Sequence, residues 1–241
     1  MSHTDPYTFL KTLITKEEAE NRARISKTRT AAPLVVTLSR DYGAGGETIA
    51  QKLGNCLGIP VHDSMILELA AQKAHVDPSR FRHPEEPPSS GISSFIYSLL
   101  TGTNGEPETY RRALYGAVLE LAQKDGLLVG RGAHLILSGK HVFRVRIVGS
   151  RLVCAQRVAK DLGITLQAAE RKVFEINNKR HKSIDSLFKD SCEHCSLSYA
   201  KNFDLIINTD HIEPINAVPI IMLALQQGGF DLQRTSPAGA Q

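Results

Sequence analysis

Residues 39–50 (SRDYGAGGETIA) carry a glycine-rich turn at residues 43–46. Before this turn, residues 34–38 (LVVTL) form a continuous apolar run that is typical of a buried strand. After it, apolar residues recur at helical spacing over residues 49–57. A strand, a glycine turn and a helix in this order bring free backbone N–H groups and the positive end of a helix dipole to one small concavity, which attracts phosphate. The stretch therefore predicts an α/β protein that handles a nucleotide.

The turn departs from the standard phosphate-binding loop, G-x-x-x-x-G-K-[ST]. Gly46 stands at the lysine position, Glu47 stands where serine or threonine is usual, and Arg40 stands at the first glycine position. Another cation must then neutralise a bound phosphate. Arginine suits this task, because its guanidinium can grip phosphate oxygens in pairs.

Strand-like and helix-like segments alternate along most of the chain, which predicts a parallel sheet with helices on both faces. Ligands of such sheets lie at the carboxyl ends of the strands, and Gly130-Arg131-Gly132 follows an apolar strand just as the first turn does. The expected strands are residues 34–38, 58–62, 127–129, 142–148 and 204–208. Beyond the first helix, the expected helices are one starting at residue 64, residues 93–100, 108–124, 151–162 and 165–190, and one starting at residue 214 that Pro219 kinks or shifts.

The bulk composition limits the class of protein. The chain has 241 residues, of which 41% are hydrophobic, enough for a packed core. Its net charge of +4 suits a small anionic ligand as well as nucleic acid, and no Lys/Arg block is dense enough to favour nucleic acid. No stretch approaches the roughly 18 apolar residues that span a membrane. With few cysteines and no secretory pattern, we expect a reduced, cytoplasmic protein and leave its oligomeric state open.

The cysteines allow several interpretations. Cys192 and Cys195 form a single C-x-x-C pair, whereas structural zinc commonly takes two such pairs. His181 and His194 could complete a ligand set, so zinc, a redox pair and unligated loop cysteines all remain open, and we expect the last. Cys56 and Cys154 fall at apolar helical positions and are expected in the core. The sequence therefore assigns no metal ligands.

Five segments, in order, resemble the cytidylate kinase-like family of P-loop proteins. They are residues 39–50, 57–63 (LGIPVHD), 129–133 (VGRGA), 178–180 (NKR) and 203–209 (FDLIINT). The resemblance implies a P-loop NTPase-like three-layer sandwich with about five parallel strands, a helical lid and a monophosphate-binding subregion. We accordingly expect a peripheral helical arm at residues 1–32, a kinase-like domain at residues 33–226 with its lid-like region near residues 165–200, and a disordered tail at residues 227–241.

The resemblance also implies roles for particular residues. The loop backbone would cradle the phosphates of ATP, and Glu47 or Thr48 would contact Mg²⁺ directly or through water. The residues expected to bind ATP are Gly43, Ala44, Gly45, Gly46, Glu47 and Thr48. The candidate catalytic cations are Arg40, Arg131 and Arg180. The residues expected on the acceptor side are Asp63, Ser64 and Asp41.

Each assignment has a plainer alternative. The loop could be a tight turn without a ligand, and Arg131 could cap the carbonyls at a strand end. Arg40 could face solvent, and Arg180 could lie on a solvated helix face. Glu47 could be an ordinary first-turn acid, and Asp63 with Ser64 could only cap a helix. The family often has an acidic residue about three positions before its lid arginine, where this chain has Asn177.

The implied activity is ATP- and Mg²⁺-dependent phosphoryl transfer to a nucleoside monophosphate, with CMP as a candidate acceptor. A nucleotide-binding regulator with little or no turnover is the main alternative, and Gly46, Glu47 and Asn177 favour it. A structural or partner-binding module that keeps only the fold is the third. Neither a membrane nor a nucleic acid is an expected partner.

Overall fold

One five-stranded sheet organises the protein. The computed structural model describes residues 32–73, 107–188 and 194–232, so the arm at residues 1–31 and the helix expected at residues 93–100 lie outside the described residues. The strands are β1 (Val35–Arg40), β2 (Val61–His62), β3 (Gly126–Val129), β4 (Phe143–Val148) and β5 (Leu205–Asn208). They lie in the order β2-β3-β1-β4-β5, and every neighbouring pair is parallel. The predicted α/β class with a parallel five-stranded sheet is confirmed.

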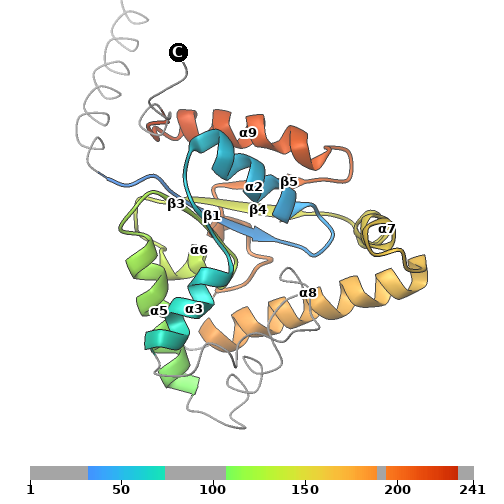
Figure 1. Ribbon diagram of the computed structural model, residues 1–241, viewed down its shortest axis with the longest axis horizontal. Coiled ribbons are helices and arrows are strands. Elements are labelled where there is room, and N and C mark those ends of the chain that lie inside the picture. The colour runs from blue at the N-terminus through green and yellow to red at the C-terminus, as the bar shows by residue number, and fades with distance from the viewer. Residues whose placement is uncertain (1–31, 74–106, 189–193, 233–241) are drawn as a thin grey trace, which may run out of the picture.

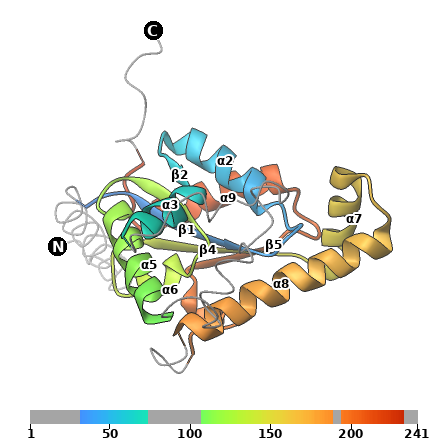
Figure 2. The same cartoon turned by 60° about the horizontal axis from the view of Figure 1, so that its bottom comes forward.

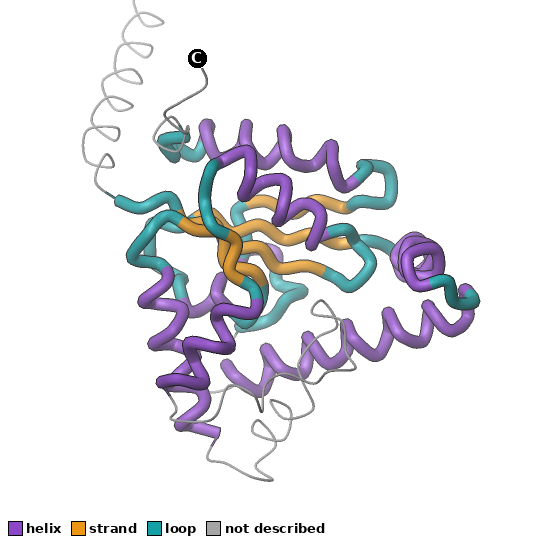
Figure 3. The backbone as a smooth tube through the Cα atoms, in the orientation of Figure 1, coloured by secondary structure: helices purple, strands orange, loops and turns teal. Residues whose placement is uncertain are grey.

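Helices cover both faces of this sheet (Figures 1 and 2). The described helices are α2 (Gly46–Leu57), α3 (Ser64–Lys73), α5 (Pro107–Leu121), α6 (Ala133–Ile136), α7 (Arg151–Leu162), α8 (Leu166–Phe188) and α9 (Pro214–Gln227). The helices α2 and α9 lie side by side on one face, and α3, α5 and α6 lie on the other. The long helix α8 runs across this second side, beneath the strand ends that carry the glycine turn (Figure 3). These helices form the outer layers of a three-layer α/β/α arrangement.

The central strand explains why the sheet is covered twice. In β1, Val36 and Leu38 face the apolar cluster of α2 and α9, while Val35 faces the cluster of α3 and α5. Such continuous apolar strands are typical of parallel sheets buried on both faces. In β4, Phe143 and Val145 join the first cluster, as the alternation predicted. Arg144 and Arg146 follow these two residues in the alternation of β4 and therefore lie on the second face.

A set of buried polar side chains lies on that second face, below the strand ends. Ser39 Oγ is 3.2 Å from Nδ1 of His134, and the His134 ring stacks on Phe203 with 4.7 Å between ring centroids. Burial lowers the pKa of His134 to about 3, and the charge of Arg146 adds to this effect. Thr37 Oγ1 is buried without a hydrogen-bond partner in the described part of the chain. The second face of β1 is therefore more polar than its first.

Two expectations about the cysteines need correction. Cys56 is exposed rather than in the core, whereas Cys154 is buried as expected. Cys195 is disulfide-bonded, so it is not a free loop cysteine as expected. Across the described ranges, no three His, Cys, Asp or Glu residues are grouped to hold a metal.

The packed part of the chain extends past the expected boundary at residue 226. Phe230 lies against His141, with 4.4 Å between ring centroids, and edge-on to Phe143 at 5.6 Å. Phe230 and Leu232 of the expected tail therefore pack against the core, and residues 233–241 lie outside the described residues. The helix α9 continues through Pro219. None of the helices in the described ranges is long and apolar enough to cross a membrane.

Candidate functional site

The glycine turn joins β1 to α2 in a conformation that needs its glycines. Gly43 and Gly45 have left-handed backbones, with φ of +84° and +78°, which residues with a Cβ rarely adopt. A Cβ on Gly43 would lie 2.6 Å from the carbonyl oxygen of Cys154. The helix α2 begins at Gly46, and no side chain among the described residues caps it. Its first N–H groups have no partner within the helix, so this end of α2 can receive an anion.

Arg40 lies over the position at which the usual lysine would begin. A Cβ placed on Gly46 would be 2.5 Å from Cβ and 2.6 Å from Cγ of Arg40. At its far end, Nη1 of Arg40 lies against the backbone of Gly130, so closely that a Cβ there would overlap it. The side chain of Arg40 therefore runs from the glycine turn to the loop that follows β3. A cation is present beside the turn although the lysine is absent.

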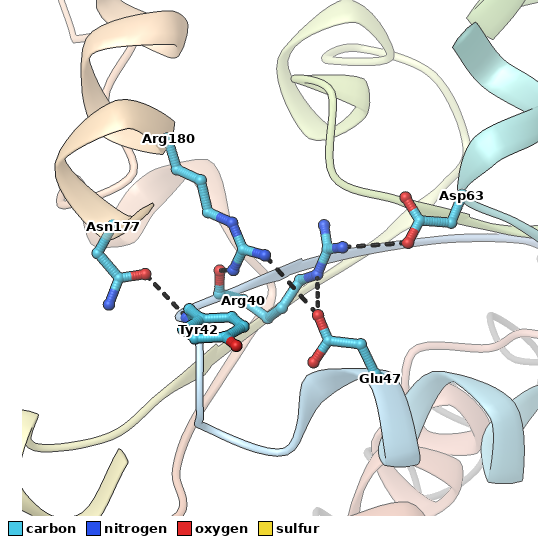
Figure 4. A network of polar contacts seen from close by, with 6 residues as sticks. All are labelled: Arg40, Tyr42, Glu47, Asp63, Asn177 and Arg180. Carbon is cyan, nitrogen blue, oxygen red and sulfur yellow. Dashed lines mark hydrogen bonds and ion pairs between the residues drawn. The ribbon is translucent and has the colours of Figure 1, made fainter. Parts of the chain in front are cut away.

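Two carboxylates hold the Arg40 guanidinium (Figure 4). Nε donates to Oε1 of Glu47 at 3.1 Å, and Nη2 donates to Oδ2 of Asp63 at 3.1 Å. Only 9% of the Arg40 side chain is exposed. The interpretation of Arg40 as a solvent-facing residue is therefore wrong.

Arg180 reaches the same place from α8. Its Nη1 donates to the Arg40 carbonyl at 2.9 Å, and its Nη2 lies 3.7 Å from Oε1 of Glu47. Its guanidinium also lies 5.9 Å from the centre of the Tyr42 ring. Figure 4 shows both side chains beside Arg40. Burial lowers the pKa of Arg180 to about 10, and the neighbouring charge of Arg40 contributes. Arg180 is thus a buried cation at neutral pH and does not lie on a solvated face.

Asn177, one helical turn before Arg180 in α8, bonds to the residue that precedes the glycine turn. Its Oδ1 accepts a hydrogen bond from the backbone N–H of Tyr42 at 2.8 Å. An aspartate could accept the same bond, so asparagine at this position keeps the contact while removing a negative charge. The two anchors, Asn177 to Tyr42 and Arg180 to Arg40, grip the backbone on either side of Asp41.

Arg131 has an unusual backbone. It has φ of +54° and lies between Gly130 at +74° and Gly132 at +70°, so three consecutive residues are left-handed. For a residue with a Cβ this conformation costs about 1–2 kcal/mol. Backbone strain of this kind collects at functional sites. The turn directs Arg131 to the same pocket as Arg40 and Arg180.

These arginines line a small pocket, called the arginine pocket below. Its charged lining residues are Arg40, Arg131, Arg180 and Asp63, and the buried Ser39 and His134 also line it. Its volume is about 60 Å³. This volume is well below the roughly 300–1,000 Å³ that is usual for small-molecule pockets. It suits a single phosphoryl-sized anion.

A second and larger pocket, the loop-side pocket, shares no lining residue with the first. Its volume is about 390 Å³, within the usual range for small-molecule sites. Gly43, Gly45 and the exposed Thr48 line one side of it. Residues of α7, including Arg157, and the start of α9 at Glu213 line the other. The glycine turn thus borders a pocket of nucleoside size.

Some expected site residues do not face either pocket. Asp41 is paired with Arg146, whose Nη2 lies 2.5 Å from Oδ1 of Asp41. Ser64 is exposed at the first position of α3. Ala44 is fully buried, and its N–H donates to the carbonyl of Asp41 at 3.3 Å. None of these residues lines the arginine pocket or the loop-side pocket.

Sequence reasoning missed two residues that contact the glycine turn. Arg157 Nη1 lies 3.5 Å from the carbonyl oxygen of Gly43, and Thr209 Oγ1 donates to the Ala44 carbonyl at 3.0 Å. Thr209 could have been found, because it is a polar residue directly after a strand, where ligand sites of parallel sheets gather. Arg157 carries no such signal in a helix that is rich in charged residues.

The sequence profile of the cytidylate kinase-like family matches residues 35–211. The chain belongs to the cytidylate kinase-like family. Membership places it among nucleotide-binding, kinase-like proteins, and the match includes the glycine turn, Arg131 and Arg180. No curated protein matches the chain significantly.

The chain is similar to several solved structures at low sequence identity. An uncharacterized protein from Eubacterium ventriosum has a TM-score of 0.58 and 16% identity, covering 80% of this chain and 98% of that one. Shikimate kinase from Acinetobacter baumannii, in complex with shikimate, has a TM-score of 0.46 and 16% identity, covering 84% of this chain and 97% of that one. Shikimate kinase from Bacteroides thetaiotaomicron has a TM-score of 0.45 and 15% identity, covering 80% and 98%. The first of these likenesses supports the fold alone.

Proposed function

We propose that this protein transfers the γ-phosphoryl group of ATP to a nucleoside monophosphate, with CMP as the acceptor to test first. The observation that carries the proposal is the convergence of Arg40, Arg131 and Arg180 on one pocket next to an uncapped helix N-terminus. Phosphoryl transfer requires little of a protein beyond positioning and positive charge. The chain supplies both without the usual lysine.

The donor nucleotide fits the glycine turn. The N–H groups at the start of α2 and the dipole of that helix favour its phosphates. The loop-side pocket, bordered by Gly43, Gly45 and Glu213, has the volume to hold its nucleoside part. ATP, when bound, supplies the phosphoryl group. The protein's own contribution is to orient that group and to keep compensating charge beside it.

The acceptor fits the arginine pocket by its phosphate end. At about 60 Å³ the pocket is too small for a whole nucleotide, so the nucleoside of the acceptor would extend out of it. Arg131 and Arg180 would hold the acceptor phosphate and offset the negative charge that develops during transfer. Asp63 borders the same pocket and keeps Arg40 directed toward it.

The residues around the turn also fit Mg²⁺ carried by the nucleotide. Mg²⁺ usually keeps several waters and takes few protein oxygens beside the phosphates. Glu47 already contacts Arg40 and Arg180, so the exposed hydroxyl of Thr48, acting through water, is the simpler contact. A direct contact with Glu47 would require that carboxylate to leave Arg40.

A nucleotide-binding regulator with little or no turnover is the second candidate. The observation that favours it is the pairing of Arg40 with both Glu47 and Asp63. Two carboxylates beside the phosphate site oppose the negative charge of a transferring phosphoryl group. In this account the protein binds nucleotide and forms no product.

A product assay separates the candidates. Purified protein with MgATP and each nucleoside monophosphate in turn should form ADP and one diphosphate. Arg131→Lys should lower kcat by about 10²–10³, because a lysine cannot replace a bidentate guanidinium. Arg151→Ala, an exposed arginine near Phe174, serves as the matched control and should keep full activity.

The negative outcomes are equally specific. A rise in melting temperature with MgATP but no product from any monophosphate would select the regulator. No shift and no product would exclude both and leave a module that keeps only the fold. If Arg131→Lys matched the unchanged protein in kcat, the role of the arginine pocket would be wrong.

A further inference from the structure

Two neighbouring carbonyl groups of the glycine turn contact side chains from α7 and from the end of β5. The Gly43 carbonyl faces Nη1 of Arg157 at 3.5 Å, and the Ala44 carbonyl accepts from Thr209 Oγ1 at 3.0 Å. Arg157 in turn donates to the hydroxyl of Thr209 at 3.0 Å and to its carbonyl at 2.6 Å. Thr209 is therefore the centre of a small network that ends on the turn.

We propose that Thr209 is a positioning residue that sets the direction of the phosphate-binding amides, with Arg157 as its support. This proposal rests on the proposed function, since it assumes that the turn holds phosphate. A peptide unit is planar, and its C=O and N–H point in opposite directions. Fixing the Ala44 carbonyl toward Thr209 therefore directs the Gly45 N–H the other way.

The turn needs such an external anchor because of its composition. Glycine populates many backbone conformations, so a Gly-Ala-Gly-Gly segment does not hold one conformation by itself. The amides must keep fixed directions to bind a phosphate at low entropic cost. Thr209 is suited to fix them, because it directly follows β5 and its own N–H donates to the carbonyl of Val148, the last residue of β4, at 2.9 Å. The same carbonyl lies 3.2 Å from the Thr209 hydroxyl, whose one proton goes to the closer Ala44 carbonyl. The anchor thus ties the turn to the rigid sheet.

Burial separates this role from direct ligand contact. Thr209 is 0% exposed, and it lines neither the arginine pocket nor the loop-side pocket. A change at Thr209 can therefore alter phosphate binding only through its neighbours. Arg157 lines the loop-side pocket and could contact a nucleotide directly, so Thr209 gives the cleaner test.

The test measures binding of tripolyphosphate with Mg²⁺ by calorimetry, because this probe lacks a nucleoside and reports on the turn. Thr209→Val keeps the side-chain shape and removes the hydroxyl, and its affinity should fall roughly tenfold, as expected for a lost hydrogen bond that leaves a carbonyl unpaired. Thr209→Ser restores the hydroxyl and should bind within twofold of the unchanged protein. Thr37→Val is the matched control, since it also removes a buried threonine hydroxyl, one without a partner among the described residues.

The outcomes distinguish this proposal from the proposed function. If the unchanged protein binds no tripolyphosphate, both are overturned. If it binds and Thr209→Val binds equally well, or if Thr37→Val loses as much affinity, the positioning role alone is overturned. Should Thr209→Val fail to fold, Thr209→Ala replaces it with the same expected loss.

Discussion

Arg40 covers Gly46, so that a Cβ on this glycine would lie 2.5 Å from the Cβ of the arginine. Two of the three departures from the standard phosphate loop, at Gly46 and at Arg40, are therefore one structural feature. Glycine at the lysine position makes room for arginine at the first glycine position. This relationship explains how a loop without lysine still has a cation beside its amides.

Restoring the lysine alone should harm the protein. In Gly46→Lys the new side chain would collide with Cβ and Cγ of Arg40, and overpacking of this kind costs about 1–3 kcal/mol. The double change Gly46→Lys with Arg40→Gly should recover most of that loss, because it removes the collision. Urea unfolding of the four proteins in a double-mutant cycle measures this coupling. Additive effects of the two changes would contradict the arrangement.

Stability should fall in mild acid because of His134. Its pKa is about 3 in the folded protein, lowered by burial from 6.5. Between pH 6.5 and pH 3, the unfolded chain binds a proton at His134 that the folded chain does not bind. The contribution of His134 to the free energy of unfolding is therefore complete above pH 6.5 and is lost as the pH falls toward 3. The loss between pH 7 and pH 5 amounts to about 2 kcal/mol.

Comparing the unchanged protein with His134→Asn isolates this effect. Asparagine can keep a hydrogen bond to Ser39 but does not titrate in this range. His62, whose pKa burial also lowers, is present in both proteins and cancels. Denaturant unfolding at pH 7 and pH 5 provides the measurement. An equal pH dependence in both proteins would show that His134 is protonated in the folded state.

Thr37→Val should stabilise the protein. Thr37 is 1% exposed. Its hydroxyl is buried and lacks a hydrogen-bond partner in the described part of the chain. Valine has nearly the same shape and removes the cost of burying that hydroxyl, a gain of about 1 kcal/mol. The urea midpoint should rise with an unchanged slope. A lower midpoint would mean that the hydroxyl has a partner, such as a buried water.

Cys56 and Cys154, the free cysteines of the described ranges, should differ sharply in reactivity. Cys56 is exposed on α2, whereas Cys154 is buried and burial raises its pKa to about 11. Only the thiolate reacts with iodoacetamide, so native protein at pH 8 should be labelled at Cys56 and not at Cys154. Peptide mass spectrometry after brief labelling checks this. Rapid labelling of Cys154 would contradict the packing of α7 against the turn.

Much of the fold could be predicted from local patterns. The expected strand at residues 142–148 matches β4 closely, because alternating or continuous apolar runs report burial directly. The order of the strands could not be read in this way, since it depends on which strands pair. The prediction for Cys56 was wrong because this residue lies at the edge of the buried face of α2. Its neighbour Leu57 is buried, whereas Cys56 is exposed.

The candidate site was predictable only in part. The glycine turn and Arg131 follow strands directly, so their common location could be expected from the topology of parallel sheets. The contacts of Arg40 with Glu47 and Asp63 depend on side-chain directions that no spacing reveals. The pairing of Asp41 with Arg146 likewise removed a residue that its sequence position alone placed in the site.

The most direct test of the account follows the backbone amides of the turn by ¹⁵N NMR during a titration with MgATP. MgATP should cause large shifts at Gly43, Gly45 and Gly46. It should cause small ones at Gly139 and Gly163, two left-handed glycines with no atom close to their Cβ positions. In Arg40→Ala the shifts at the turn should require roughly 10- to 100-fold more nucleotide, the cost of a lost charge-assisted contact. Turn amides that stay unmoved while MgATP binds elsewhere, or that respond equally in Arg40→Ala, would contradict the claim that the turn and Arg40 together hold phosphate.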